Sequence, residues 1–490
     1  MPIRWGGWNL VSSARSGGSS FAVPGVPAIP TIVQMVMSST NIPGVQGQAG
    51  TDFKFSLPNP CQQHNCLELT MIYQSGIAAP TITDNLGNTW PSTPTVSADG
   101  GAGGNVLEKR ILKNINAGQG IFHVVFVSPG AFPFQYTITE WCNVDTVSPV
   151  NGTASAASIT GPSLATGSFT PPANNDANGG NLISASFGLN QGTSGFGVTS
   201  WVTGGSFALL ASDNWNGAVQ TLPQASEYLV QAAQAAINPG MTSTGSNTDL
   251  YNAVAVALKV ASAGSPKPAA GSGKIWIDRV YHFSTLGSSI PLVVKAPLTG
   301  NLHLIDSPVG NGWTPVVDSG SGSWIKRGGS GSSAIWESAN RAADPNFTLT
   351  ITLNNPSGQS FRIFDVSNAA VSPFEVFASA VSGTLPAGTT ILNDMPDITP
   401  LTTPAVANLV FLSGVMGIGP ATGFNTGAPA GAIFDLCTYP EELDGSSMEN
   451  ADICAHFLNT NTTLITWNFT IRSQPGGSGA DACSAVYKAA

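Results

Sequence analysis

The feature that most constrains this chain is a stretch of sequence that occurs twice. Ile82–Trp90 reads Ile-Thr-Asp-Asn-Leu-Gly-Asn-Thr-Trp, and Leu304–Trp313 reads Leu-Ile-Asp-Ser-Pro-Val-Gly-Asn-Gly-Trp. Two more pairs of segments lie at nearly the same separation: Tyr136–Glu140 with Phe361–Asp365, and Asn181–Ala185 with Asn408–Leu412. The separation drifts from 306 − 84 = 222 to 408 − 181 = 227, as loop insertions would produce. We therefore interpret the chain as a duplication in which each half forms the same fold.

The repeated stretch predicts a structural turn. Its members in the first half are Asp84, Gly87, Asn88 and Trp90, and the corresponding residues in the second half are Asp306, Gly310, Asn311 and Trp313. An aspartate in this position accepts hydrogen bonds from the backbone two residues on, and a glycine adopts a positive φ at no steric cost. The tryptophan would then close the edge of a sandwich. A cation site would need more oxygen ligands than one aspartate and one asparagine supply.

Short runs of β-branched and aromatic residues follow one another along both halves. Phe53–Leu57, Leu67–Tyr73 and Ile121–Val127 are examples, and Gly, Pro, Asn and Asp separate them. This spacing is typical of a sandwich, and 56 Gly with 35 Pro disfavour long helices. The pattern breaks off and restarts within each half, which favours crossover connections. We therefore predict an all-β protein with two tandem antiparallel β-sandwiches, jelly-roll-like, and an extended N-terminal arm.

Composition places the domain boundaries. The residues before position 29 are rich in Gly, Ser and Pro, and Ala261–Gly273 combines small residues with two prolines, which is typical of a flexible linker. Val150–Gly180 and Thr384–Pro404 are interpreted as long polar connections inside the two halves. The predicted organisation is an arm (1–28), a first sandwich (29–260), a linker (261–273) and a second sandwich (274–490) that duplicates the first.

Charge excludes two classes of partner. Charged residues make up 9% of the chain, against about 25% in typical soluble domains, and the formal net charge is −10. Only 17 Lys and Arg are present, too few for a surface that neutralises nucleic-acid phosphates or anionic lipids. Apolar runs such as Leu409–Val415 are far shorter than the roughly 20 residues that span a bilayer. We expect neither nucleic-acid binding nor membrane insertion.

The first residues, Met1–Trp8, lack the basic and apolar regions of a classical secretion signal. Three routes out of the cell remain open: export without such a signal, removal of a signal that Met1 replaces, or release by lysis. Six cysteines in 490 residues do not decide the redox compartment.

Candidate reactive groups are few. Cys61 and Cys66 suit a local disulfide or two free thiols, because zinc would need a fourth ligand besides these and His64. The acidic stretch Glu441–Asp452 departs from the ligand spacing of calcium loops, and it lacks the paired carboxylates that glycosidases require. The five histidines lie far apart, and no Gly-x-Ser-x-Gly turn supplies a nucleophile. No catalytic, cofactor-binding or metal-binding residue is predicted.

Four tryptophans beside Gly, Ser and Asn loops are candidate glycan contacts: Trp201, Trp215, Trp324 and Trp336. A flat ring that is apolar on its face and polar at its edge suits a sugar ring. The alternative for each of these tryptophans is burial in a core or an interface.

Several of these segments carry a resemblance. They are Cys66-Leu-Glu-Leu-Thr, Thr83-Asp-Asn-Leu-Gly-Asn-Thr-Trp, Thr137-Ile-Thr-Glu-Trp, Asn181-Leu-Ile-Ser-Ala and Ala253-Val-Ala-Val-Ala-Leu-Lys-Val. In this order they resemble a β-sandwich module of bacterial surface and secreted proteins of unassigned function. The resemblance covers residues 30–260 and, more loosely, 285–490, and it implies a fold without an activity. The plan of two sandwiches in one chain is also similar to that of double jelly-roll viral capsid proteins.

Three functions remain open from the sequence. The first is a non-enzymatic structural protein that self-associates as a homo-oligomer in a virion, as a capsid, decoration or fibre component, and it accounts best for the missing signal. The second is an adhesin or carbohydrate-binding module at a bacterial cell surface, which rests on the resemblance and the tryptophans. The third is a secreted polysaccharide-active enzyme, for which no pair of carboxylates can be named.

Overall fold

The protein is described from a computed structural model. The described residues are 29–40, 51–127, 134–172, 180–191, 200–212, 223–244, 249–261, 274–285, 292–295, 298–307, 313–319, 322–327, 334–344, 346–353, 359–381, 397–404, 406–417, 424–427, 433–434, 450–471 and 480–490. In these ranges the secondary structure consists of strands without any helix, which confirms the all-β prediction. A helix able to cross a membrane is accordingly absent from the same ranges. The predicted arm (1–28) and residues 262–273 of the predicted linker lie outside them.

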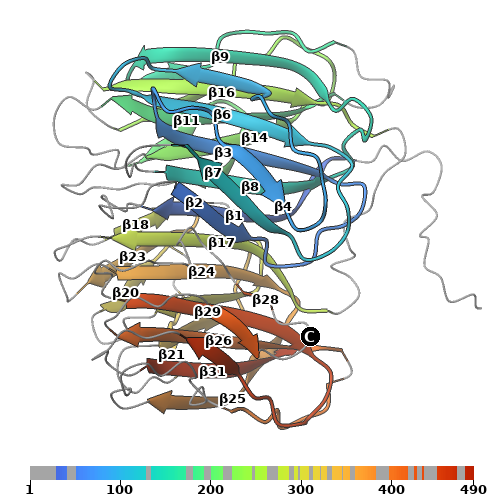
Figure 1. The fold of residues 1–490 in the computed structure, drawn as a ribbon, viewed down its shortest axis with the longest axis vertical. Coiled ribbons are helices and arrows are strands. Elements are labelled where there is room, and N and C mark those ends of the chain that lie inside the picture. Colours follow the sequence, from blue (N-terminus) through green and yellow to red (C-terminus); the bar gives the residue numbers. More distant parts are fainter. Residues whose placement is uncertain are drawn as a thin grey trace, which may run out of the picture.

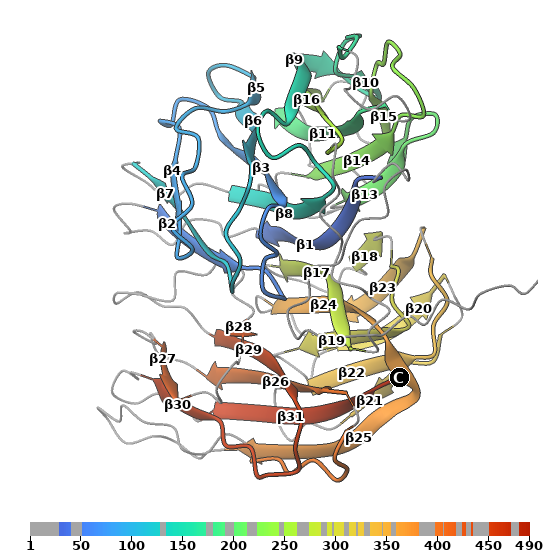
Figure 2. The same cartoon turned by 90° about the vertical axis from the view of Figure 1, so that its right-hand side faces the viewer.

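The first eight strands form a sandwich that we call module I (Figures 1 and 2). They are β1 (Thr31–Thr40), β2 (Thr51–Ser56), β3 (Cys66–Gln74), β4 (Thr81–Asp84), β5 (Val96–Asp99), β6 (Asn105–Leu112), β7 (Ile121–Phe126) and β8 (Phe134–Cys142). One sheet has the order β5-β6-β3-β8-β1, and the other has the order β2-β7-β4. In β7 the alternate residues Phe122, Val124 and Phe126 are buried, the period expected of a strand with one face on a core.

Module II follows with the same plan. Its strands are β9 (Val150–Thr160), β10 (Ser163–Ala165), β11 (Leu182–Gln191), β12 (Trp201–Thr203), β13 (Ala208–Ser212), β14 (Gln224–Val230), β15 (Gly240–Ser243) and β16 (Leu250–Leu258). The five-stranded sheet has the order β9-β16-β11-β14-β13, and the three-stranded sheet has the order β10-β15-β12. Each strand of module I therefore has a counterpart eight strands later in an equivalent place.

The second half of the chain repeats both modules. Module III comprises β17 (Trp276–Thr285), β18 (Leu292–Lys295), β19 (Leu302–Ser307), β20 (Trp313–Asp318), β21 (Ile325–Lys326), β22 (Ala334–Ala339), β23 (Thr348–Leu353) and β24 (Gln359–Ser367). Module IV comprises β25 (Ala369–Val381), β26 (Asn408–Gly417), β27 (Phe424–Gly427), β28 (Ile433–Phe434), β29 (Asn450–Asn459), β30 (Asn468–Ile471) and β31 (Ala480–Ala489). Their five-stranded sheets have the orders β17-β24-β19-β22-β21 and β25-β31-β26-β29-β28. Each range predicted as one sandwich thus contains two sets of packed sheets.

One predicted loop is a strand. Val150–Gly180 was expected to be a long polar connection, but it contains β9 and β10. The middle of β9, Asn151–Ser158, reads Asn-Gly-Thr-Ala-Ser-Ala-Ala-Ser, with one β-branched residue and no aromatic residue, so its strand propensity is weak. Pairing with the buried strand β16 holds it in the sheet. This strand opens module II, and its weak signal concealed the second sandwich of the first half.

The two halves meet at their first strands. β1 pairs with β17 in parallel, from Met35 opposite Arg279 to Thr40 opposite Ser284, and this pairing joins modules I and III into one ten-stranded sheet. The paired strands are equivalent, and the strand orders run outward from them in opposite directions. The halves are therefore related by an approximate rotation about an axis along these strands, which exchanges the two faces of the sheet.

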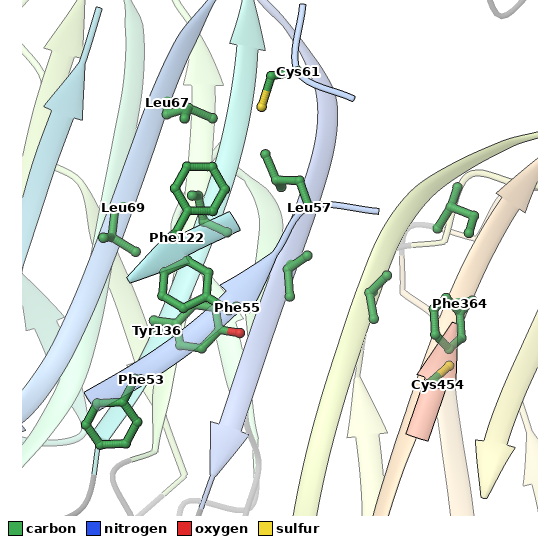
Figure 3. Packing of buried hydrophobic residues seen from close by; sticks show 14 of the residues in the cluster. Phe53, Phe55, Leu57, Cys61, Leu67, Leu69, Phe122, Tyr136, Phe364 and Cys454 are labelled. Carbon is green, nitrogen blue, oxygen red and sulfur yellow. The ribbon is translucent and has the colours of Figure 1, made fainter. Parts of the chain in front are cut away.

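The exchange of faces is visible in the buried residues. Val36 and Val280 are paired and belong to one hydrophobic cluster. Val36 faces the core of module I, where the Phe55 and Tyr136 rings stack with centroids 4.0 Å apart (Figure 3). Val280 is on the same face of the sheet, but there module IV covers it through residues such as Phe411. The neighbouring cluster holds the opposite face, where module II covers module I.

Candidate functional sites

The predicted turn of the first half is present at the end of β4. Asp84 Oδ1 accepts hydrogen bonds from Leu86 N (2.9 Å) and Asn88 N (3.2 Å). Asp84 Oδ2 accepts from Asn88 Nδ2 (3.1 Å) and from Trp90 Nε1 (2.7 Å). Gly87 has a φ of 72°, and Trp90 is buried against the module I core. One carboxylate thus holds the turn and anchors the tryptophan.

The second copy of this turn lies further along the chain than predicted. β20 is the equivalent of β4, and it ends at Asp318. Asp318 Oδ1 accepts from Gly322 N (2.9 Å), four residues on, and Asp318 Oδ2 accepts from Trp324 Nε1 (2.9 Å), six residues on. These are the offsets of Asn88 and Trp90 from Asp84. The two turns share only the aspartate, the tryptophan and the spacing between them. A comparison of consecutive residues in the two halves therefore did not identify Asp318 as the equivalent of Asp84.

The residues assigned to the second turn have other positions. Asp306 is in β19 with its side chain buried between modules, and Trp313 is the first residue of β20. Gly310 and Asn311 lie outside the described residues. The prediction of a turn at Asp306 is wrong, because strand pairing of Leu302–Ser307 with β22 and β24 continues through this aspartate.

Removal of the turn carboxylate tests its structural role. We expect Asp84→Ala to lower the free energy of unfolding by about 2 kcal/mol, because four donors lose a charged acceptor. Denaturant unfolding followed by tryptophan fluorescence measures this loss. Asp145→Ala is the matched control, since Asp145 holds an exposed turn through two backbone N–H groups and no tryptophan. Equal losses in the two variants would contradict the anchoring role of Trp90.

A buried ion pair lies between modules I and II. Lys109 Nζ of β6 donates to Glu68 Oε1 of β3, and it also contacts Thr70 Oγ1 (3.2 Å). From module II, Ser184 Oγ of β11 donates to Glu68 Oε1 (2.6 Å). Trp141 Nε1 donates to Glu68 Oε2 (3.0 Å). Burial lowers the pKa of Lys109, and the Glu68 charge opposes that shift.

The interface between modules III and IV carries a similar group. Arg362 Nη1 of β24 donates to Asp306 Oδ2 of β19 (2.7 Å). Ser413 Oγ of β26 donates to the other oxygen of Asp306. In both halves an acid on the third strand of one module therefore binds a base beside it and a serine on the central strand, β11 or β26, of the next module's five-stranded sheet. These charges hold the five-stranded sheets face to face.

At one edge of the interface between modules I and II, the end of β11 packs closely against the hairpin between β5 and β6. Asn190 Oδ1 of β11 accepts from Asn105 N (2.8 Å), and Asn105 Nδ2 donates to the carbonyls of Leu189 and Asn190 (both 2.9 Å). A Cβ at Gly100 would lie 1.6 Å from Asn190 Oδ1. Glycine at this position is therefore required for the asparagine to enter the hairpin between β5 and β6.

A small pocket lies where module IV meets the first half. Its volume is about 160 Å³, and its lining is mostly apolar, with residues from β17, β26, β28, β29 and the loop after β2. The two polar side chains among these residues hold the joint together: Asn59 Nδ2 donates to Ile277 O (2.6 Å), and His456 Nε2 lies 2.6 Å from Pro58 O. The polar groups of this pocket therefore have a structural role.

Cys61 and Cys66 do not form the disulfide considered from the sequence. Cys61 belongs to the core of module I, as Figure 3 shows, while Cys66 belongs to the cluster on the opposite face of the sheet. Burial raises the pKa of both thiols, with the Glu140 and Asp84 charges adding to the shift at Cys61 and Glu68 and Glu140 at Cys66. His64, between them in sequence, is exposed and bonds Asn114 through Nδ1 (2.7 Å).

The candidate glycan tryptophans do not form one platform. Trp201 is buried in the core of module II, where its ring meets Tyr251 edge-on at 6.0 Å, so it is not accessible to a glycan. Trp324 and Trp336 are half-buried against a cluster that includes Phe347 and Ile363 of module III. Trp215 lies outside the described residues, as does the acidic stretch up to residue 449. Among the described residues, no three His, Cys, Asp or Glu side chains gather to hold a metal ion.

Comparison with protein-family models, curated proteins and solved structures finds no match.

Glu227 is a buried acid that sequence reasoning missed. It lies on β14 opposite Ala185 and Leu209, residues of the module II core, and its Oε2 accepts from Gly204 N (3.2 Å). Burial raises the pKa of Glu227 to about 8, while backbone N–H groups of Gly204 and Gly240 oppose the shift. No sequence period or motif predicts the burial of Glu227, because the residues that surround it come together only when module II folds.

Glu227 predicts a pH dependence of stability. A folded pKa of about 8, above the ordinary 4.5, means that folding favours the protonated acid. Its contribution is full below pH 4.5 and is lost as pH rises through 8. We expect Glu227→Gln to become more stable relative to the unmodified chain over this window, by a few kcal/mol at pH 8. Urea unfolding at closely spaced pH values measures the difference, and a constant difference would contradict the buried acid.

Proposed function

We propose that the protein is a non-enzymatic structural protein that associates with copies of itself in an extracellular assembly. A virion component, as a capsid, decoration or fibre subunit, is the form of this proposal that the sequence favours. The observation that carries it is the β1–β17 pairing, in which two copies of one module join edge to edge through equivalent strands. A module that already associates with its own copies inside the chain is suited to do so between chains.

The placement of charge supports the same proposal. In a chain with only 9% charged residues, Glu68 with Lys109 and Asp306 with Arg362 are buried at the contacts between modules. Their hydrogen bonds hold sheets of neighbouring modules against each other. Buried polar groups of this kind fix one arrangement of packed layers when every member has a partner. A rigid, multi-layered subunit is what an assembly requires.

The test is the state of association of the full chain. Sedimentation velocity across a wide concentration range, with electron microscopy of the concentrated sample, should reveal species larger than one chain with a regular shape. A single monomeric species at the highest concentration would overturn the proposal.

A further inference from the structure

Among the strands that the structure describes, two have an unpaired outer edge where their equivalents are paired. β9 and β25 hold the same place in modules II and IV as β1 and β17 hold in modules I and III: each opens its module and pairs with the last strand, β16 or β31. β1 and β17 use their outer edges to pair with each other. In the described part of the chain, no strand pairs with the outer edge of β9 or β25.

These free edges lie at the two ends of the molecule. Figures 1 and 2 place β9 and β25 at opposite ends of the longest axis, with the ten-stranded sheet between them. A contact between β25 of one chain and β9 of another would therefore leave a free β9 at one end and a free β25 at the other.

The regular segments of the two edges carry no charge or proline that would prevent pairing. Edge strands of monomeric proteins are usually protected by charges, prolines or bulges. β9 has no charged residue, and its exposed side chains over the regular run are small, as at Thr153 and Ser155. Register shifts lie on both sides of this run, between Val150 and Thr153 and between Ala156 and Ile159, where Ser158 has a φ of 54°. Regular pairing with β16 is therefore confined to Thr153–Ala156.

β25 is similarly open beyond Pro373. From Val376 to Val381 it follows β31 in regular register, and Ser379 is exposed. Its single charge, Glu375, is bound internally: the carboxylate accepts from Thr402 N (2.6 Å), Thr402 Oγ1 (2.7 Å) and Asn408 Nδ2 (3.0 Å). This charge does not face an incoming strand as a free repulsive group.

We propose that β25 of one copy pairs with β9 of the next copy, in the parallel sense in which β1 pairs with β17. The partner is a second copy of this chain because the same edge already accepts its own equivalent within the molecule. The contact is head-to-tail, so it produces a chain of subunits or a closed ring. This inference rests on the proposed self-association and assigns its surface.

The experiment blocks one end at a time. Ser155→Lys places a charge on β9, and Ser379→Lys places one on β25, both at exposed positions. We expect each variant alone to be monomeric in sedimentation velocity under conditions where the unmodified chain assembles. A mixture of the two should form dimers and nothing larger, because one free β25 and one free β9 remain. Gln74→Lys, an exposed residue at the end of β3, is the control and should assemble normally.

The outcomes separate this inference from the proposed function. If the unmodified chain assembles and both lysine variants assemble equally well, the edge pairing is wrong while self-association stands. If either variant alone forms dimers, the contact is between like edges and the head-to-tail pairing is wrong. Each lysine variant should have the same midpoint temperature of thermal unfolding as the unmodified chain. This result would show that a loss of assembly is not a loss of folding. A monomeric unmodified chain would overturn both proposals.

Discussion

Lys109→Met is expected to lower the free energy of unfolding by about 3 to 5 kcal/mol, because it leaves the buried Glu68 carboxylate without its cation. Ser184 and Trp141 would still donate to that carboxylate, but neither carries a charge. Methionine fills a similar volume, so a cavity contributes little to the loss. Urea unfolding with tryptophan fluorescence gives the free energy, and the change should affect modules I and II together because Glu68 binds both.

The double variant Glu68→Gln with Lys109→Met is the control for this prediction. Removing both charges avoids the isolated buried carboxylate, so most of the lost stability should return. A single variant that loses less than about 1 kcal/mol would place the pair in the range of exposed salt bridges and contradict its burial.

Asp306→Ala is expected to have an effect of similar size, about 3 to 5 kcal/mol, because Arg362 would remain charged and buried. The comparison with Asp318→Ala is informative. The sequence repeat assigned the turn to Asp306, whereas the structure assigns it to Asp318, which also pairs with Arg341, whose side chain is only 7% exposed. We expect a loss of similar size for Asp318→Ala, because Arg341 would also lose its partner while nearly buried.

The same denaturant titrations measure both variants, and Asp306→Ala with Arg362→Met provides the matched control. Partial recovery in that double variant is expected, as for the pair in the first half. A loss below about 1 kcal/mol for Asp306→Ala would contradict the burial of its pair with Arg362.

The candidate sites were predicted from sequence only where a local pattern sufficed. Asp84, Gly87, Asn88 and Trp90 form the expected turn because an aspartate binds its own backbone within a few residues. The buried ion pairs and the free edges join residues distant in the chain, such as Glu68 and Ser184, and no local pattern brings them together. Thr137 and Thr139 alternate with Ile138, a pattern typical of a strand with one solvent-exposed face. All three residues are nevertheless buried, because module II covers the second face of the sheet.

By itself, the sequence determined that the chain is all-β and internally repeated. Strand formation is readable from sequence because alternating apolar residues and the turn residues between them act on neighbouring positions in the chain. Only the tertiary structure decided that the repeat is fourfold, that the first strands of the two halves pair in parallel, and which face of each sheet is covered. The physical reason is that a weak strand such as β9 exists through its pairing with β16, and that the burial of a strand's second face depends on a neighbouring module.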